Sequence, residues 1–256
     1  MKPEQAPFPE DGSALLTLRP IARIRTDFPT KFGIPRQAGV VPMLRGTVVF
    51  EPEYRVEEAL RGLEQFSHIW LIWGFSENFG REWSPTVRPP RLGGNTRMGV
   101  FATRSPFRPN ALGLSCVRLL GIHRADKSDP DNTEAQGLVL EVAGADMMDG
   151  TPIYDIKPYI PYADSIPDAS DGFAPDPGRT LSVRFPEDLQ RKVPEDKRES
   201  LAAALANDPR PRYQRDPERV YGMSFAGLEV RFLVKEGELT VTEVTRAAAD
   251  GKGETE

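Results

Sequence analysis

The chain has 256 residues, of which 39% are hydrophobic, with a net charge of −5, one cysteine and two histidines. It contains no apolar run near the ~20 residues of a membrane span, no signal-peptide pattern in its acidic first residues, and no cysteine or histidine spacing typical of a metal site. We therefore expect a cytoplasmic protein that binds no metal and forms no disulfide.

The charge is distributed unevenly. Arg19–Arg124 holds 15 Arg and one Lys against 8 acidic residues, whereas the rest of the chain holds 17 basic and 30 acidic residues. Five arginines and no acid occur from Arg88 to Arg108. Because the guanidinium group matches phosphate and carboxylate geometry and stacks on bases, we expect an anion-binding face. The alternative is that these arginines pair with acids from elsewhere in the fold.

In chain order, residues 1–14 are predicted to be a disordered tail, and short strands follow. Apolar–polar alternation or continuous apolar runs predict strands at 16–27, 44–52, 68–75, 98–103, 113–126 and 137–146. Apolar residues at helical spacing predict a short amphipathic helix at 56–67. The intervening segments are predicted to be loops rich in proline and glycine, with a turn-rich extended segment at 147–165.

The C-terminal part is predicted to be a separate small α+β domain at 180–246. A linker is expected at 168–179 and a disordered tail at 247–256. Inside the domain we expect strands at 181–185, 221–234 and 238–245 and a helix within 195–211. Because at least six short strands precede the first long helix, residues 15–167 are predicted to form a mainly β barrel or sandwich. A Rossmann sheet is excluded, since strands and helices do not alternate and no glycine-rich dinucleotide motif occurs.

Four stiff loops carry the polar groups that a site would need. They are "KFGIPRQ" (31–37), "RPPRLGGN" (88–95), the 104–110 loop between two strand-like runs, and "DGTPIYDIKPY" (149–159). Prolines fix φ in these loops and glycines allow close backbone approach, which lowers the entropic cost of holding a ligand. Any one of these loops alone is better interpreted as a rigid connection between strands, but four together favour a binding site.

Several single residues allow two interpretations. His68 is expected to be structural, with a role in the site as the alternative. Cys116 is expected to be a buried structural thiol instead of a nucleophile. Trp70 and Trp73 are expected to lie in the core, whereas Trp83 lies in a predicted loop and is open to a base-stacking role.

These segments resemble a known family. "KFGIPRQAG", "VRPPRLGGN", "GVFATRSPFRPNALGLS" and "DGTPIYDIKPYIPYADS" look like the motifs of the TsaA-like (YaeB/TrmO) family, and the resemblance spans roughly residues 17–245. Members of this family are S-adenosylmethionine-dependent methyltransferases that modify N6 of threonylcarbamoyladenosine beside the tRNA anticodon. The resemblance implies a TsaA-like β-barrel, an S-adenosylmethionine cofactor, a tRNA anticodon loop as partner, and a homodimer.

The resemblance also implies roles for individual residues. The cofactor contacts that it carries over are Gln37, Ala38, Gly39, Phe75, Ser76, Arg104, Leu114, Ala143, Gly144, Ala145 and Asp146. In physical terms, Arg104 can hold the methionine carboxylate, and Asp146 can accept hydrogen bonds from the ammonium or the ribose. Leu114 is equally compatible with a place in the core.

Substrate contacts and catalysis are assigned from the same segments. We expect the phosphate or the threonyl carboxylate to be met by Arg36, Arg108, Asn110, Lys157 and Tyr159. N6 of the substrate is a urea-type nitrogen, so catalysis requires alignment and a proton acceptor. Asp149, Tyr154 and Asp155 are the candidates for orientation or proton acceptance. The alternatives are a non-catalytic RNA- or nucleotide-binding barrel and a hydrolase of phosphorylated small molecules, although no nucleophile motif supports the hydrolase.

Overall fold

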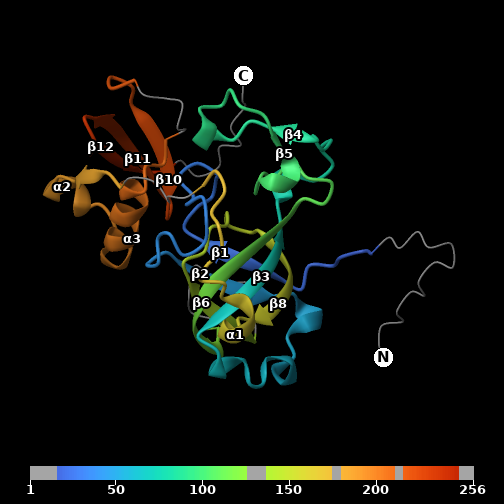
Figure 1. Cartoon of the computed structure of the whole chain (residues 1–256). Helices are drawn as coiled ribbons and strands as arrows, with labels where there is room; N and C mark the ends of the chain where they lie inside the picture. The colour runs from blue at the N-terminus through green and yellow to red at the C-terminus, as the bar shows by residue number, and fades with distance from the viewer. Residues whose placement is uncertain (1–15, 126–136, 175–179, 211–215, 248–256) are drawn as a thin grey trace.

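The computed structural model describes residues 16–125, 137–174, 180–210 and 216–247. Its main body is a closed barrel with the strand order β1-β2-β7-β6-β3-β8 (Figure 1). The barrel strands are β1 (Ala22–Thr26), β2 (Arg45–Phe50), β3 (His68–Gly74), β6 (Leu112–Arg124), β7 (Leu138–Ala143) and β8 (Pro152–Pro158). This architecture confirms the predicted mainly β fold.

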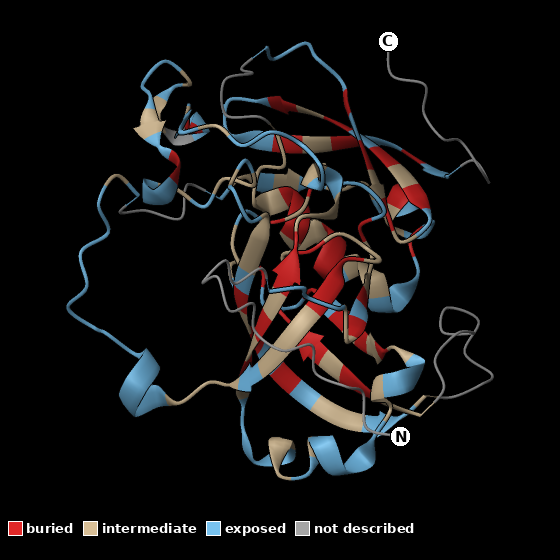
Figure 2. Ribbon diagram, turned by 90° about the vertical axis from the view of Figure 1, so that its right-hand side faces the viewer, coloured by how far each residue is buried: buried red, intermediate tan, exposed pale blue. Residues whose placement is uncertain are grey.

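The barrel closes because β1 pairs with strands on both sides. Ala22 lies opposite Phe50 of β2 and opposite Ile153 of β8, and both pairings are antiparallel. Burial alternates along β2 and β3, and the buried residues of the barrel are red in Figure 2. Ile24, Ile69 and Leu71 are fully buried in one apolar cluster. Burial of such side chains stabilises the fold by about 1.5–3 kcal/mol each.

The C-terminal unit is a four-stranded sheet with the order β10-β11-β12-β9, to which α2 and α3 belong. Its elements are β9 (Ser182–Arg184), α2 (Glu187–Gln190), α3 (Glu195–Ala206), β10 (Tyr221–Phe225), β11 (Leu228–Lys235) and β12 (Glu238–Arg246). Phe28, Val41 and Leu44, from the segment between β1 and β2, are buried in the cluster of this unit. The 28–44 segment therefore packs on the C-terminal sheet, whereas the strands on either side of it, β1 and β2, belong to the barrel.

Two short strands form a hairpin outside the barrel. β4 (Thr86–Val87) pairs with β5 (Met98–Gly99), and in Figure 1 this hairpin lies above the barrel, on the other side from the C-terminal sheet. The short helix α1 (Pro161–Asp164) follows β8. Among the described residues, no helix is long and apolar enough to cross a membrane.

Three local predictions were wrong. Residues 56–67 form 3₁₀ turns instead of an amphipathic helix, because Gly62 takes φ 91° and interrupts the helical path. The strand expected at 98–103 ends at Gly99 and continues as a 3₁₀ turn. The strand expected at 221–234 is a hairpin, since Ala226 and Gly227 both have positive φ values and form a turn. The predicted tails at 1–14 and 247–256, apart from Ala247, and residues 175–179 of the predicted linker lie outside the described residues.

Candidate functional site

A cavity of about 600 Å³ opens beside the barrel strands β3 and β6. Its lining comes from five segments, namely residues 31–38, 70–78, 103–108, 112–116 and 146–148 together with Thr151. Apolar and aromatic side chains form most of its wall, with a few polar groups at defined positions. Ligand pockets of this size and composition are typical of small-molecule and cofactor sites.

The 37–39 segment is held against the end of β7 by two glycines. Gly39 N donates to Gly144 O at 2.8 Å, and Gly144 N donates to Leu44 O at 2.8 Å. Gly144 has φ +81°, and a Cβ atom there would lie 3.2 Å from the backbone of Gly39. This close approach brings the "GIPRQAG" loop next to the segment that carries Asp146, although the two are about a hundred residues apart.

A hydrogen-bond chain leads from the barrel core to the cavity. Trp73 Nε1 donates to Ser115 Oγ at 2.9 Å, and Ser115 Oγ donates to Asp146 Oδ1 at 2.6 Å. Trp73 and Ser115 are buried, whereas Asp146 is partly buried and lines the cavity. The chain fixes the orientation of the carboxylate, to which backbone N–H groups of Asp146 and Ala38 also bond.

Burial raises the pKa of Asp146 above its ordinary value. The hydrogen bond from Ser115, the backbone N–H groups of Asp146 and Ala38, and the charge of Arg104 act in the opposite direction and lower it. Desolvation is the largest of these effects, so the ionised carboxylate gains from any cationic ligand group that enters the cavity.

Trp73 reaches Ser115 because Gly113 leaves room for its ring. Gly113 lies opposite Trp73 in the β3–β6 pair, and a Cβ atom at Gly113 would lie 2.2 Å from the indole. Phe75 packs edge to face on Trp73 with ring centroids 4.4 Å apart. Together these residues give the cavity an aromatic wall beside Asp146.

The rim of the cavity is cationic. Arg104 donates to Gln37 Oε1, which joins the 104–110 loop to the 31–37 loop. Lys31, Arg36 and Arg108 also line the cavity. The site therefore offers a carboxylate for a cationic group, arginines for an anionic group, and an aromatic wall for a planar apolar group.

Comparisons with known proteins match both parts of the chain. The tRNA-methyltransferase O N-terminal domain family matches residues 23–165, and the TrmO C-terminal domain family matches residues 178–247. A tRNA (adenine(37)-N6)-methyltransferase of Escherichia coli is 39% identical over 225 residues, which cover 84% of this chain and 91% of that protein. A tRNA (adenine(37)-N6)-methyltransferase of Eikenella corrodens is 47% identical over 67% of this chain and 93% of that protein.

The crystal structure of TrmO from Pseudomonas aeruginosa superposes with a TM-score of 0.72 at 34% identity, and covers 90% of this chain and 98% of that one. The chain belongs to the TrmO family. The predicted family resemblance is thereby confirmed over both the barrel and the C-terminal sheet.

Most of the cofactor residues implied by the TrmO resemblance lie together. The cavity wall includes Gln37, Ala38, Phe75, Ser76, Arg104, Leu114 and Asp146. Leu114 is 57% exposed, so it belongs to the cavity surface and not to the barrel core. The cavity wall does not include Gly39, Ala143, Gly144 and Ala145, although the hydrogen bond between the two glycines holds the 37–39 loop in place. Their contact with a cofactor stays a prediction.

The residues predicted to bind the substrate are more dispersed. Arg36 and Arg108 line the cavity, whereas Asn110, Lys157 and Tyr159 do not. Arg108 Nη1 donates to Thr103 O at 2.7 Å and to Val100 O at 3.2 Å. Lys157 pairs with Asp155 at 3.1 Å, and the ring of Tyr159 lies 5.8 Å from that of Trp70.

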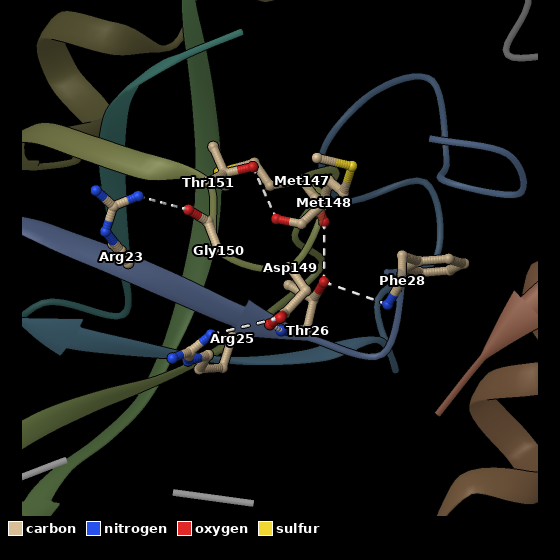
Figure 3. Close-up of polar contacts among 9 residues, drawn as sticks. All are labelled: Arg23, Arg25, Thr26, Phe28, Met147, Met148, Asp149, Gly150 and Thr151. Atoms are coloured by element: carbon tan, nitrogen blue, oxygen red, sulfur yellow. Dashed lines mark hydrogen bonds and ion pairs between the residues drawn. The ribbon is translucent and has the colours of Figure 1, made fainter. Parts of the chain in front are cut away.

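The three predicted catalytic residues lie outside the cavity wall. Asp149 accepts a hydrogen bond from Thr26 N at 3.0 Å and pairs with Arg25 at 3.5 Å (Figure 3). Asp155 accepts from the backbone N–H of Ile156 and pairs with Lys157. Burial raises the pKa of Tyr154, so its hydroxyl stays protonated at neutral pH. Their part in the chemistry stays a prediction.

The site contains residues to which the sequence assigned other roles. Trp73 lies in the barrel core as expected and also lines the cavity. Trp70, expected in the core as well, is half-buried on the cavity wall, and its Nε1 donates to Asp164 at 3.2 Å. Cys116, expected to be buried, is half-buried on the cavity wall, and burial raises the pKa of its thiol. Ser115 carried no signal of its own, because an isolated serine in an alternating strand reads as an outward-facing residue.

Proposed function

We propose that this chain transfers a methyl group from S-adenosylmethionine to N6 of adenine 37 in tRNA, where that adenine carries a threonylcarbamoyl group. The observation that carries the proposal is the chemistry of the cavity, which combines an ordered carboxylate, an arginine and an aromatic wall. Its relatives in Escherichia coli and Eikenella corrodens are named tRNA (adenine(37)-N6)-methyltransferases.

The residues present fit S-adenosylmethionine, whose bound form supplies a methyl group on a sulfonium sulfur. Arg104, which Gln37 orients, can pair with the carboxylate of the amino acid part. Asp146, which Ser115 orients, can accept from the ammonium or from a ribose hydroxyl. Phe75 and Leu114 offer an apolar surface to the adenine.

The protein contributes mainly by holding its side chains in place. The Trp73–Ser115–Asp146 chain and the Gly39–Gly144 contact fix the cavity before any ligand enters, which lowers the cost of alignment. Because Asp149 accepts a hydrogen bond from Thr26 N in β1, we propose that it positions that strand, whereas Asp155 pairs with Lys157 of its own strand β8. Because Asp146 is assigned to the cofactor, we propose that the proton of N6 passes to Glu77, the other carboxylate on the cavity wall.

We also propose that the chain acts as a cytoplasmic homodimer on the anticodon loop and that its two domains are joined by the linker expected at 168–179. The second candidate function is a non-catalytic RNA- or nucleotide-binding barrel. The two differ in whether a bound cofactor donates its methyl group.

The test is a methylation assay with labelled S-adenosylmethionine and tRNA from cells that lack this enzyme. We expect label at adenine 37, and nuclease digestion followed by mass spectrometry locates it. Calorimetry with the cofactor alone is the companion measurement. Absence of cofactor binding would disprove the proposal, and binding without methyl transfer would support the non-catalytic barrel.

A further inference from the structure

The segment from Gly80 to Asn110 forms a lobe that holds itself in shape. The β4–β5 pair lies within it, Val100 N donates to Pro85 O at 3.0 Å, and Ser84 N donates to Phe107 O at 3.3 Å. Five prolines fix φ along this stretch. A segment with so little conformational freedom can present side chains at defined positions.

Two aromatic side chains of this lobe are exposed to solvent. Trp83 is 50% exposed and Phe101 is 73% exposed. Their rings are nearly parallel, with an interplanar angle of 20° and centroids 6.5 Å apart. Clustered, ordered and exposed aromatic rings mark interaction surfaces, because leaving them in water forfeits the gain from burying them.

Arg108 connects the aromatic pair to the cavity. Its guanidinium carbon lies 5.8 Å from the centroid of Phe101, and its Nη1 binds the carbonyls of Val100 and Thr103 on either side of that residue. Arg108 and Thr103 also line the cavity. The aromatic pair is therefore rigidly linked to the site, a few residues from its rim.

The positive charge of the lobe indicates that its partner is a polyanion. Gly80–Asn110 contains six arginines and a single acid, Glu82. Arg81, Arg88 and Arg97 are exposed, and none of them forms an ion pair with another residue that the structure describes. Exposed aromatic rings among unpaired arginines are typical of surfaces that bind single-stranded nucleic acid.

We propose that Trp83 and Phe101 form a stacking platform for an unpaired nucleotide of the RNA loop whose adenine enters the cavity. This inference rests on the proposed function for the identity of the RNA. The arginines contact the neighbouring phosphates, and the rings stack on a base, which requires no particular sequence. A surface that binds a protein would carry charges of both signs around the aromatic pair, whereas the charged residues of this lobe are almost all arginines.

The experiment compares the full-length variants Trp83→Ala and Phe101→Ala with Trp83→Phe, which keeps an aromatic ring. Phe66→Ala is the matched control, because Phe66 is also an exposed phenylalanine, at 37%, and follows the 3₁₀ turns at 57–65 in the cyan segment below the barrel in Figure 1. Binding of a fluorescent anticodon stem-loop RNA is measured by anisotropy, without cofactor. Cofactor affinity is measured by calorimetry, and mass in solution by light scattering.

We expect each platform alanine variant to weaken RNA binding by roughly 5- to 150-fold, while Trp83→Phe and Phe66→Ala stay near wild type. Cofactor affinity and mass stay unchanged in all variants. Unchanged RNA affinity in both alanine variants overturns the platform. A smaller mass together with weaker RNA binding also overturns it, because the surface is then an interface between two copies. Since RNA binding is read without methylation, failure of the methylation assay alone disproves the proposed function and leaves the platform standing.

Discussion

Gly144 sets the distance between the 37–39 loop and the segment that carries Asp146, so its replacement by alanine tests how the cavity is built. A Cβ atom at this position meets Gly39 Cα and Gly39 N at 3.2 Å, and both are backbone atoms. Relief therefore requires the loop to move, since no flexible side chain is there to turn away. The φ angle of +81° adds strain for any residue with a Cβ.

The magnitude follows from these two effects. The left-handed conformation costs about 1–2 kcal/mol, and forcing the extra carbon against the backbone costs about 1–3 kcal/mol. We expect Gly144→Ala to lower the free energy of unfolding by about 2–5 kcal/mol and Tm by roughly 4–20 °C. The loop shift also displaces Gln37 and Ala38, so S-adenosylmethionine affinity is expected to fall by roughly tenfold or more.

The matched control is Gly62→Ala. Gly62 has φ +91°, but its added Cβ meets only a side-chain atom, at 3.7 Å, and the residue lies in the 3₁₀ turns far from the cavity wall. This variant loses only about 1–2 kcal/mol of stability and keeps wild-type cofactor affinity. Urea denaturation and calorimetry at a temperature where both variants are folded provide the comparison. Wild-type cofactor affinity in folded Gly144→Ala would refute the role assigned to this contact.

Three further variants test the polar groups. Arg104→Ala should weaken cofactor binding by roughly tenfold or more with a stability change within about 0.5 kcal/mol; a large fall in Tm with unchanged affinity would make Arg104 structural. Burial raises the folded-state pKa of Asp146. The free energy of unfolding of wild type relative to Asp146→Asn should therefore be greatest below the unfolded pKa near 4 and fall as pH rises through the raised pKa. A difference between the two proteins that stays constant in urea titrations from pH 4 to 8 would contradict this. Asp149→Ala should lower the free energy of unfolding by about 1–3 kcal/mol, because it leaves Thr26 N without its acceptor. Its methylation rate per folded molecule should stay within a few-fold of wild type. Loss of methylation with normal stability would instead indicate a catalytic role for Asp149. Asp155→Ala, which breaks a largely exposed ion pair, should change stability by less than about 1 kcal/mol and serves as its control.

The strands were predictable because their burial alternates or is continuous over five residues or more. The run at 68–75 and the alternation at 113–126 correspond to the adjacent strands β3 and β6. The 56–67 segment was not predictable, since its apolar spacing fits a helix, but Arg61 is extended and Gly62 has a positive φ, so the helical path is interrupted there. The resemblance supplied the cofactor residues as a set, but it did not show that the contact between Gly39 and Gly144 positions the 37–39 loop.

The Trp73–Ser115–Asp146 chain could not be predicted, because it depends on strand register. Trp73 lies opposite Gly113, so its ring passes over the position without a side chain and meets Ser115 two residues further along β6. A register shift of one residue would place Trp73 opposite a leucine and turn Ser115 to the other face of the sheet. The interpretation of Trp73 as a core residue was therefore incomplete. The same ring fills the core with its apolar surface and, through its one N–H group, orients the carboxylate on which the site depends.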